Sequence, residues 1–166
     1  MQNRYNYVFD DLTNTYNFAT KNDVLYRVAF INDETFSTIS GEEIPNVFQL
    51  IVEKSNDGIE PYDSKVSKTI EDIIERFFNK IENSLIYICS DENEKAEKRH
   101  EIFNRWYKKS KYREIIIKID NVISITIDDN SIKKFYTSFM FHKHNSNFEK
   151  LLEIYSQFEK TLNGEK

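Results

Sequence analysis

Short apolar and aromatic segments alternate with polar turns over the first third of the chain. The segments YNYVF, TYNFAT, VLYRVAFI and VFQLIVE are rich in aromatic and β-branched residues, which favour extended backbone on a half-buried sheet. The stretches between them contain Asp, Asn, Thr and Gly, the residues typical of turns. The pattern predicts an antiparallel meander over residues 4 to 53.

The hydrophobic period changes to that of an α-helix in the segment PYDSKVSKTIEDIIERFFNKIEN, residues 61–83. Asp63 or Ser64 stands where a side chain caps the first turn of a helix. The apolar residues recur at spacings of three and four, which places them on one helical face. They are Val66, Ile70, Ile73, Ile74, Phe77, Phe78 and Ile81.

The second half of the chain alternates strands with helices. SLIYICS is apolar throughout and too short for a helix, so it predicts a strand buried on both faces. A second helix follows at residues 94 to 109, with Asp91 or Asn93 as its cap. YREIIIKID and VISITID predict two strands joined at Asp120-Asn121, and KKFYTSFMFHKH predicts a third. NFEKLLEIYSQFEKTLNG predicts a closing amphipathic helix with Gly164 at its end.

Length and element order together indicate one domain over residues 1–166. A chain of 166 residues has the size of one ordinary domain, and 14% aromatic residues suffice for a core. The order of elements predicts an α+β fold: an antiparallel N-terminal meander, two central helices flanking a short strand, C-terminal strands and a closing helix.

The sequence also favours a cytoplasmic location. No apolar run approaches the roughly 18 residues that span a bilayer. The N-terminal MQNRYNYVFDD lacks the apolar core of a signal peptide, and a single cysteine, Cys89, cannot form an intramolecular disulfide. We therefore expect a cytoplasmic protein that makes no membrane contact.

Several segments carry a resemblance to known sequences. In chain order they are YNYVFD, TYNFAT, LYRVAF, PYDSKVSKTIEDIIERFF, YICSDENEKAEKRHEIFNRWY and HKHN. Together they resemble a small family of uncharacterised bacterial proteins of about 140 to 170 residues, classed as a domain of unknown function. The family's pattern is a strand ending in Cys-Asp, an acidic turn and an Arg-containing helix ending in Phe-x-x-Trp-Phe. Matching positions are Cys89, Asp91, Arg99, Phe103 and Trp106, whereas Ser90 and Tyr107 depart from the pattern. The resemblance implies one domain and brings no activity with it.

Local motifs predict no catalytic residue. Cys89 stands between a strand and a helix start, where a helix dipole lowers a thiol pKa. The carboxylates of CSDENEK act in the opposite direction and repel anions, so an inert, buried cysteine is the interpretation we favour. Only three glycines, Gly41, Gly58 and Gly164, are present to build a phosphate-binding loop, and neither a G-x-S-x-G elbow nor a kinase motif set occurs.

His142 and His144 are the weak metal-ligand candidates. Two histidines spaced by two on a strand point to one face and suit zinc or nickel. Two ligands are too few, and a third must come from His100 or a distant carboxylate. We expect an exposed histidine pair at the end of a strand, with no metal and no cofactor.

The charge distribution supplies the main candidate site. From Lys95 to Lys118 there are nine Lys and Arg against three Glu, although the whole chain carries 23 basic and 28 acidic residues. On the second helix Lys98, Arg105 and Lys109 form one stripe. It adjoins an apolar face formed by Ala96, Ile102, Phe103, Trp106 and Tyr107. Such a stripe is either the solvated flank of an amphipathic helix or a docking surface for an anionic partner.

Arg99 is predicted to sit inside that apolar arc. A guanidinium cannot lose its charge, so a buried Arg99 requires a carboxylate such as Asp63 or Asp91, or several carbonyls. An anion pocket lined by Arg99 and nearby histidines is the alternative interpretation. The candidate binding residues are therefore Lys98, Arg99, Arg105, Trp106 and Lys109.

These patterns favour a binding protein over an enzyme. We expect an accessory or regulatory protein that contacts a protein partner with an acidic surface. A nucleic-acid-associated protein that uses the basic segment 95–113 is the first alternative, and its weakness is the net charge of -5. An enzyme whose site residues are dispersed along the chain is the second alternative, because such a site leaves no local motif.

Overall fold

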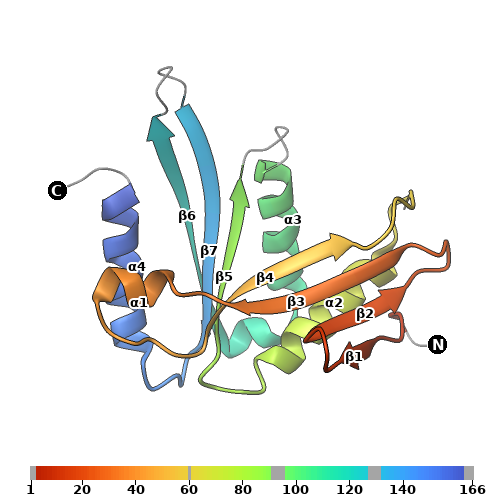
Figure 1. Cartoon of the computed structure of the whole chain (residues 1–166), viewed down its shortest axis with the longest axis horizontal. Coiled ribbons are helices and arrows are strands. Elements are labelled where there is room, and N and C mark those ends of the chain that lie inside the picture. The colour runs from red at the N-terminus through yellow and green to blue at the C-terminus, as the bar shows by residue number, and fades with distance from the viewer. Residues whose placement is uncertain (1–2, 60, 91–95, 127–131, 163–166) are drawn as a thin grey trace.

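The computed structural model describes residues 3–59, 61–90, 96–126 and 132–162 (Figure 1). In chain order its elements are β1 (Val8–Asp10), β2 (Thr15–Ala19), β3 (Leu25–Asn32), α1 (Thr35–Ser40), β4 (Val47–Lys54), α2 (Ser64–Phe77), β5 (Ser84–Ser90), α3 (Ala96–Lys109), the 3-10 helix η1 (Lys111–Glu114), β6 (Ile116–Thr126), β7 (Ile132–His142) and α4 (Phe148–Leu162). The predicted α+β fold is confirmed.

All seven strands belong to one sheet with the order β1-β2-β3-β4-β5-β7-β6. Every neighbouring pair is antiparallel except β4 and β5, which are parallel and are joined through α2. The predicted N-terminal meander is confirmed, with one correction, because α1 interrupts it between β3 and β4. Tertiary contacts hold this short helix: Phe36 is fully buried, and Asp33 Oδ1 accepts a hydrogen bond from Thr35 N.

Helix α2 follows its predicted start closely. Asp63 is the N-cap, and its side chain accepts a hydrogen bond from Lys65 N. Ile70, Ile73 and Ile74 are buried, as their spacing predicts. The prediction is wrong for Ile81, because α2 ends at Phe77 and Ile81 is 43% exposed in the following turn.

The prediction of two strands joined at Asp120-Asn121 is wrong. Strand β6 runs without a break from Ile116 to Thr126, and Asp120 pairs with Ser138 across the ladder. Ser138 Oγ donates a hydrogen bond to the Asp120 carboxylate, so this turn-favouring residue has a partner within the sheet. The start of that predicted segment forms η1, not a strand. Gly164 and the proposed caps Asp91 and Asn93 lie outside the described residues.

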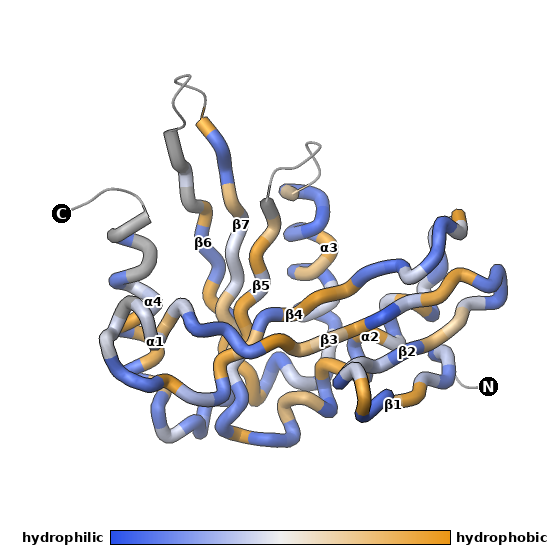
Figure 2. Tube along the Cα trace, viewed as in Figure 1, coloured by the Kyte–Doolittle hydropathy of each residue, from blue (hydrophilic) through white to orange (hydrophobic). Residues whose placement is uncertain are grey.

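Helices cover both faces of the sheet. Helices α2 and α3 pack on one face, called the helix-α3 face, in a cluster that includes Ile73, Leu85 and Phe103. Helix α4 packs on the opposite face with Ile86, Phe139 and Leu151. Figure 2 shows β5 apolar along most of its length, as a strand between two such layers requires. The prediction that β5 is buried on both faces is wrong at Ile88, which is 41% exposed.

The parallel strands β4 and β5 separate soon after they meet. Their ladder contains three residue pairs, from Val47–Ser84 to Gln49–Ile86. In Figure 1, β5, β7 and β6 then continue side by side, while β4, β3 and β2 slant away from them. The sheet thus opens between β4 and β5, on the side of β5 where α3 begins. No helix among the described residues is long and apolar enough to cross a membrane.

Candidate binding face on helix α3

Helix α3 turns an apolar arc toward the sheet and a basic surface toward solvent. Ala96, His100 and Phe103 are buried and spaced by four and three residues, which places them on one side of the helix. Lys98, Arg105 and Lys109 lie on the opposite side, and all three are exposed. The structure therefore brings the predicted stripe residues together.

A second row adjoins the stripe. Arg99 is exposed, Ile102 is 41% exposed, and Trp106 is half-buried against Phe103, with ring centroids 6.5 Å apart. Glu97 and Glu101 lie on the other side of the stripe, and Glu101 borders it, because it is three residues from Lys98 and four from Arg105. The two rows together are called the basic face: Lys98, Arg99, Ile102, Arg105, Trp106 and Lys109.

The prediction of a buried Arg99 is wrong, because the side chain is exposed, and its predicted partner Asp91 lies outside the described residues. His100, which lies about 100° further round the helix than Arg99, takes the inward position, and Arg99 lies at the edge of the buried arc. Burial raises the pKa of the Cys89 thiol, and the positive charge of Arg99 partly offsets that rise. Because Arg99 is exposed, no large stability cost is expected when it is removed.

The cations of the basic face are available to a partner. Within the described ranges, no carboxylate lies within ion-pair distance of Lys98, Arg99, Arg105 or Lys109. At the C-terminal end of α3 the face meets acidic residues of α2. There Lys109 helps to line a depression of about 300 Å³, together with Glu71, Asp72 and Glu75.

A polar cluster that is largely buried, apart from the exposed Asp120, connects α3 to β6 and β7. The side chain of Lys118 is only 3% exposed, and its ammonium donates hydrogen bonds to Asp120 and to Asn104 of α3. Ser138 Oγ donates to Asp120 Oδ1 at 2.7 Å, and His100 Nε2 lies 3.9 Å from the same oxygen. Burial lowers the pKa of Lys118, although Asp120 opposes that shift.

This cluster has the residue types of a catalytic site without the geometry. Ser138 donates to Asp120 and not to His100, so no serine–histidine relay exists. Burial also lowers the pKa of His100, which favours a neutral imidazole, and its buried Nδ1 has no hydrogen-bond partner among the described residues. Sequence reasoning missed the cluster. The available signal was the pair Lys118 and Asp120, two charges at i and i+2 of an apolar strand, which share one face.

The cysteine and histidine candidates do not form a site. Cys89 is 3% exposed, which confirms its predicted burial, and its raised thiol pKa disfavours the nucleophilic thiolate. The prediction of an exposed histidine pair is wrong for His142, which is 8% exposed because it ends the buried run of β7. Its Nδ1 accepts a hydrogen bond from His144 N and is therefore not free to bind a metal. No group of three or more metal-binding side chains occurs among the described residues.

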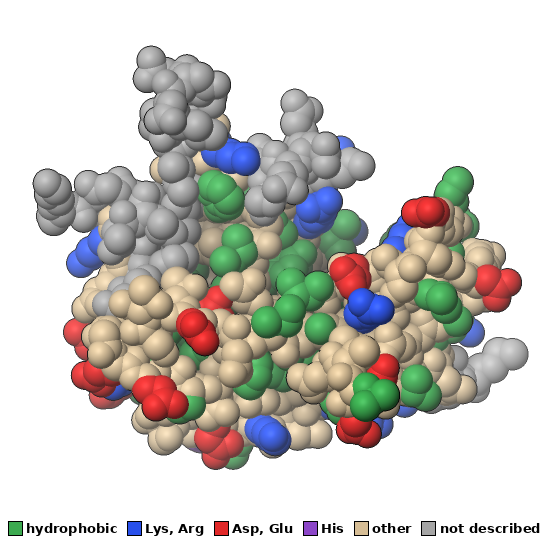
Figure 3. Space-filling model, viewed as in Figure 1, with side chains coloured by type: hydrophobic (Ala, Val, Ile, Leu, Met, Phe, Trp, Pro, Cys, Tyr) green, Lys and Arg blue, Asp and Glu red, His purple; other side chains and the backbone are tan. Residues whose placement is uncertain are grey.

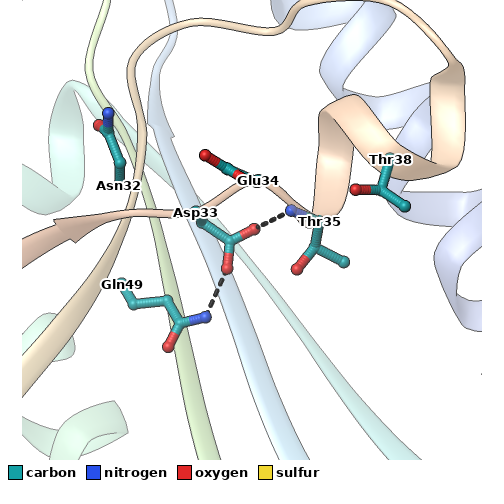
Figure 4. A pocket seen from close by; sticks show the side chains of 6 residues that line it. All are labelled: Asn32, Asp33, Glu34, Thr35, Thr38 and Gln49. Atoms are coloured by element: carbon teal, nitrogen blue, oxygen red, sulfur yellow. Dashed lines mark hydrogen bonds between the residues drawn. The ribbon is translucent and has the colours of Figure 1, made fainter.

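A shallow depression of about 450 Å³ lies where β3 meets α1 (Figure 4). Asp33 stands at its centre and is 5% exposed. One carboxylate oxygen accepts from Thr35 N and the other from Gln49 Nε2, at 2.5 Å. Because both oxygens hold the local fold together, this carboxylate is not available to a ligand, and the basic face is the better candidate site.

Comparison with known proteins identifies one relationship. Residues 62–160 match the family model described as a family of unknown function, DUF6169. The matched region begins just before α2 and ends within α4, so it includes the whole of α3. No curated protein and no solved structure matches the chain.

Proposed function

The chain belongs to DUF6169, a family of unknown function, and from the geometry of α3 we propose that it is a binding protein. Its basic face docks onto an acidic surface of a partner protein. In this proposal it serves as an accessory or regulatory protein in the bacterial cytoplasm.

The observation that carries the proposal is the composition of the basic face. Four cations without described ion partners surround Ile102, which is exposed, and Trp106, which is half-buried. Charged groups at an interface steer and orient the partner, whereas an aromatic ring and an aliphatic chain supply contact area. A merely solvated helix flank requires neither Ile102 nor Trp106.

A protein partner fits this molecule better than nucleic acid does. The net charge is -5 and the sequence pI is about 5.3, so a nucleic-acid backbone meets repulsion from most of the surface. The acidic residues of α2 border the basic face at Lys109 and limit its extent. A compact cationic patch of this size suits an acidic protein segment more than a long phosphate track.

The proposal is tested by charge reversal. We expect Lys98→Glu, Arg105→Glu and Lys109→Glu, introduced together, to weaken binding of a fluorescein-labelled peptide rich in Glu and Asp by at least about tenfold. The affinity of the original chain should fall as NaCl rises from about 50 to about 300 mM, and that of the variant should change less. Fluorescence anisotropy measures both.

A matched control carries the same change of charge elsewhere. Lys21, Lys134 and Lys160 are exposed and lie outside the basic face, so their joint replacement by Glu should leave peptide affinity within about twofold. Equal losses in the two triple variants would show that only net charge matters and would refute a docking face. Loss of single-stranded DNA binding without loss of peptide binding would replace the acidic protein by nucleic acid as the partner.

A further inference from the structure

Hydrogen bonds at the two ends of β4 show toward which neighbouring strand the N–H and C=O groups of each residue point. Asn46 O accepts from Ser84 N of β5 at 2.8 Å, whereas Val47 O accepts from Asp33 N at 2.8 Å on the β3 side. Ser55 N likewise donates to Leu25 O of β3. Successive residues of a strand present their N–H and C=O groups to opposite sides. Val52 and Lys54 therefore present theirs toward β5.

These groups face a part of the sheet where β4 has no strand neighbour. The β4–β5 ladder ends at Gln49 and Ile86, whereas the β3–β4 ladder continues to Lys54. Beyond Gln49, β4 is thus an edge strand on one side within the described part of the chain. A row of N–H and C=O groups without a ladder partner is a template for an additional strand.

The side chains around this edge differ between the two faces of the sheet: they are basic on the helix-α3 face and apolar on the opposite face. On the helix-α3 face, α3 packs on β5 through Phe103, whose ring centroid lies 4.4 Å from that of Tyr87, and Arg99 is exposed at the edge of the same helix. On the opposite face Ile88 is 41% exposed and Ile51 is half-buried. Figure 3 shows hydrophobic side chains grouped over the centre of that face.

We propose that the acidic partner binds here in extended conformation, as an added strand along the free edge of β4 at Val52 and Lys54. This inference rests on the proposed function and names the conformation and pattern of the partner segment. Alternate side chains of a strand point to opposite faces. Acidic residues at every second position then point to the helix-α3 face, where Arg99 lies at the sheet-facing edge of the basic face, and apolar residues between them lie beside Ile51 and Ile88.

An added strand uses both the backbone groups at the β4 edge and the side chains around it, whereas a helical ligand leaves those backbone groups unused. Main-chain hydrogen bonds to the β4 edge supply affinity that does not depend on side chains, and the alternating side chains supply specificity. An acidic helix satisfies its backbone internally and engages only side chains of the basic face. The two binding modes therefore differ in their sensitivity to changes in the peptide backbone.

Backbone methylation of a synthetic probe tests the proposal. The probe is a capped, fluorescein-labelled peptide of about eight residues in which Glu and Val alternate. In one version the amide nitrogens of the Val residues are methylated, and in a second version those of the Glu residues. Because only one set of N–H groups points to β4, we expect one version to lose at least about tenfold in affinity and the other to stay within about twofold.

Variants of the protein locate the edge. Val52→Pro removes an N–H from the free edge and should lower the affinity for the unmethylated peptide at least about fivefold. Val52→Thr keeps the N–H and a side chain of similar shape, so its affinity for that peptide should be unchanged. Circular dichroism and thermal melting verify that both variants fold. If Val52→Pro does not fold, the methylated peptides decide alone.

The outcomes separate this inference from the proposed function. Equal affinity of the two methylated peptides, together with a loss on reversal of Lys98, Arg105 and Lys109, overturns strand addition and leaves the docking face intact. A peptide that responds to neither methylation nor charge reversal overturns both.

Discussion

At the scale of single residues, the Lys118–Asp120 pair shows how unequal the two members of an ion pair can be. The Lys118 side chain is 3% exposed, whereas that of Asp120 is 42% exposed. Water can solvate the carboxylate if its partner is lost, but it cannot reach the ammonium. The penalty for an unpaired buried charge therefore falls almost entirely on the lysine side of the pair.

We predict that Asp120→Ala destabilises the protein more than Lys118→Met does. The first substitution leaves a buried ammonium without a counter-charge and should lower the free energy of unfolding by about 3 kcal/mol or more. The second removes that ammonium, keeps most of the side-chain volume and should cost about 1 kcal/mol. Urea unfolding measures both values.

Lys134→Met is the control, since Lys134 is exposed on β7. It should change the free energy of unfolding by less than about 0.5 kcal/mol. If Lys118→Met costs as much as Asp120→Ala, the asymmetry of exposure does not govern this pair.

At the scale of elements, α2 depends on both its own sequence and a distant tyrosine. Asp63 caps the first turn by accepting a hydrogen bond from Lys65 N at 2.8 Å. The same carboxylate accepts from Tyr5 Oη at 2.5 Å, which ties the helix start to the segment before β1. The Tyr5 hydrogen bond, followed by that from Lys65 N, lowers the pKa of Asp63.

We predict that Asp63→Ala lowers the free energy of unfolding by about 1 to 2 kcal/mol, because it removes the cap and the Tyr5 contact together. Tyr5→Phe removes only the second contact and should cost less. In urea unfolding the double variant should cost less than the sum of the two single variants. Additive costs would mean that Tyr5 and Asp63 act independently.

At the scale of the whole molecule, the charges are unevenly distributed, and two histidines, His100 and His142, are buried. Burial lowers the pKa of His100, where Asp120 and Glu101 oppose the shift and Lys118 adds to it. Burial also lowers the pKa of His142. Each imidazole is therefore harder to protonate in the folded protein than at its ordinary pKa of 6.5 in the unfolded chain.

We predict that the free energy of unfolding decreases as the pH falls from about 7.5 to about 5.5. Above the unfolded pKa both states bind no proton, whereas below it the unfolded chain takes up protons that the folded protein does not. Each histidine contributes at most about 1.4 kcal/mol per pH unit. His100→Gln should reduce the slope, as urea unfolding at several pH values will reveal. An unchanged slope in this variant would contradict the assignment to His100.

The sequence by itself determined the elements whose signals are local. The spacing of Ile70, Ile73 and Ile74 and the cap at Asp63 define α2, because a 3.6-residue period and an N-cap depend only on neighbours along the chain. The same is true of the N-terminal strands and of the exposed stripe at Lys98, Arg105 and Lys109. These features need no knowledge of what packs against them.

Only the tertiary structure decided the features that depend on a distant partner. Asp120 stays within a strand because Ser138 and Lys118 satisfy its carboxylate, and α1 forms because Phe36 is buried in a core assembled from other segments. Arg99 is exposed because His100 packs against β7 in its stead, with its ring centroid 5.5 Å from that of Tyr136. The free edge at Val52 likewise arises because β5 leaves β4 after three residue pairs. A helical or strand period cannot encode such pairings, since they join residues far apart in the chain.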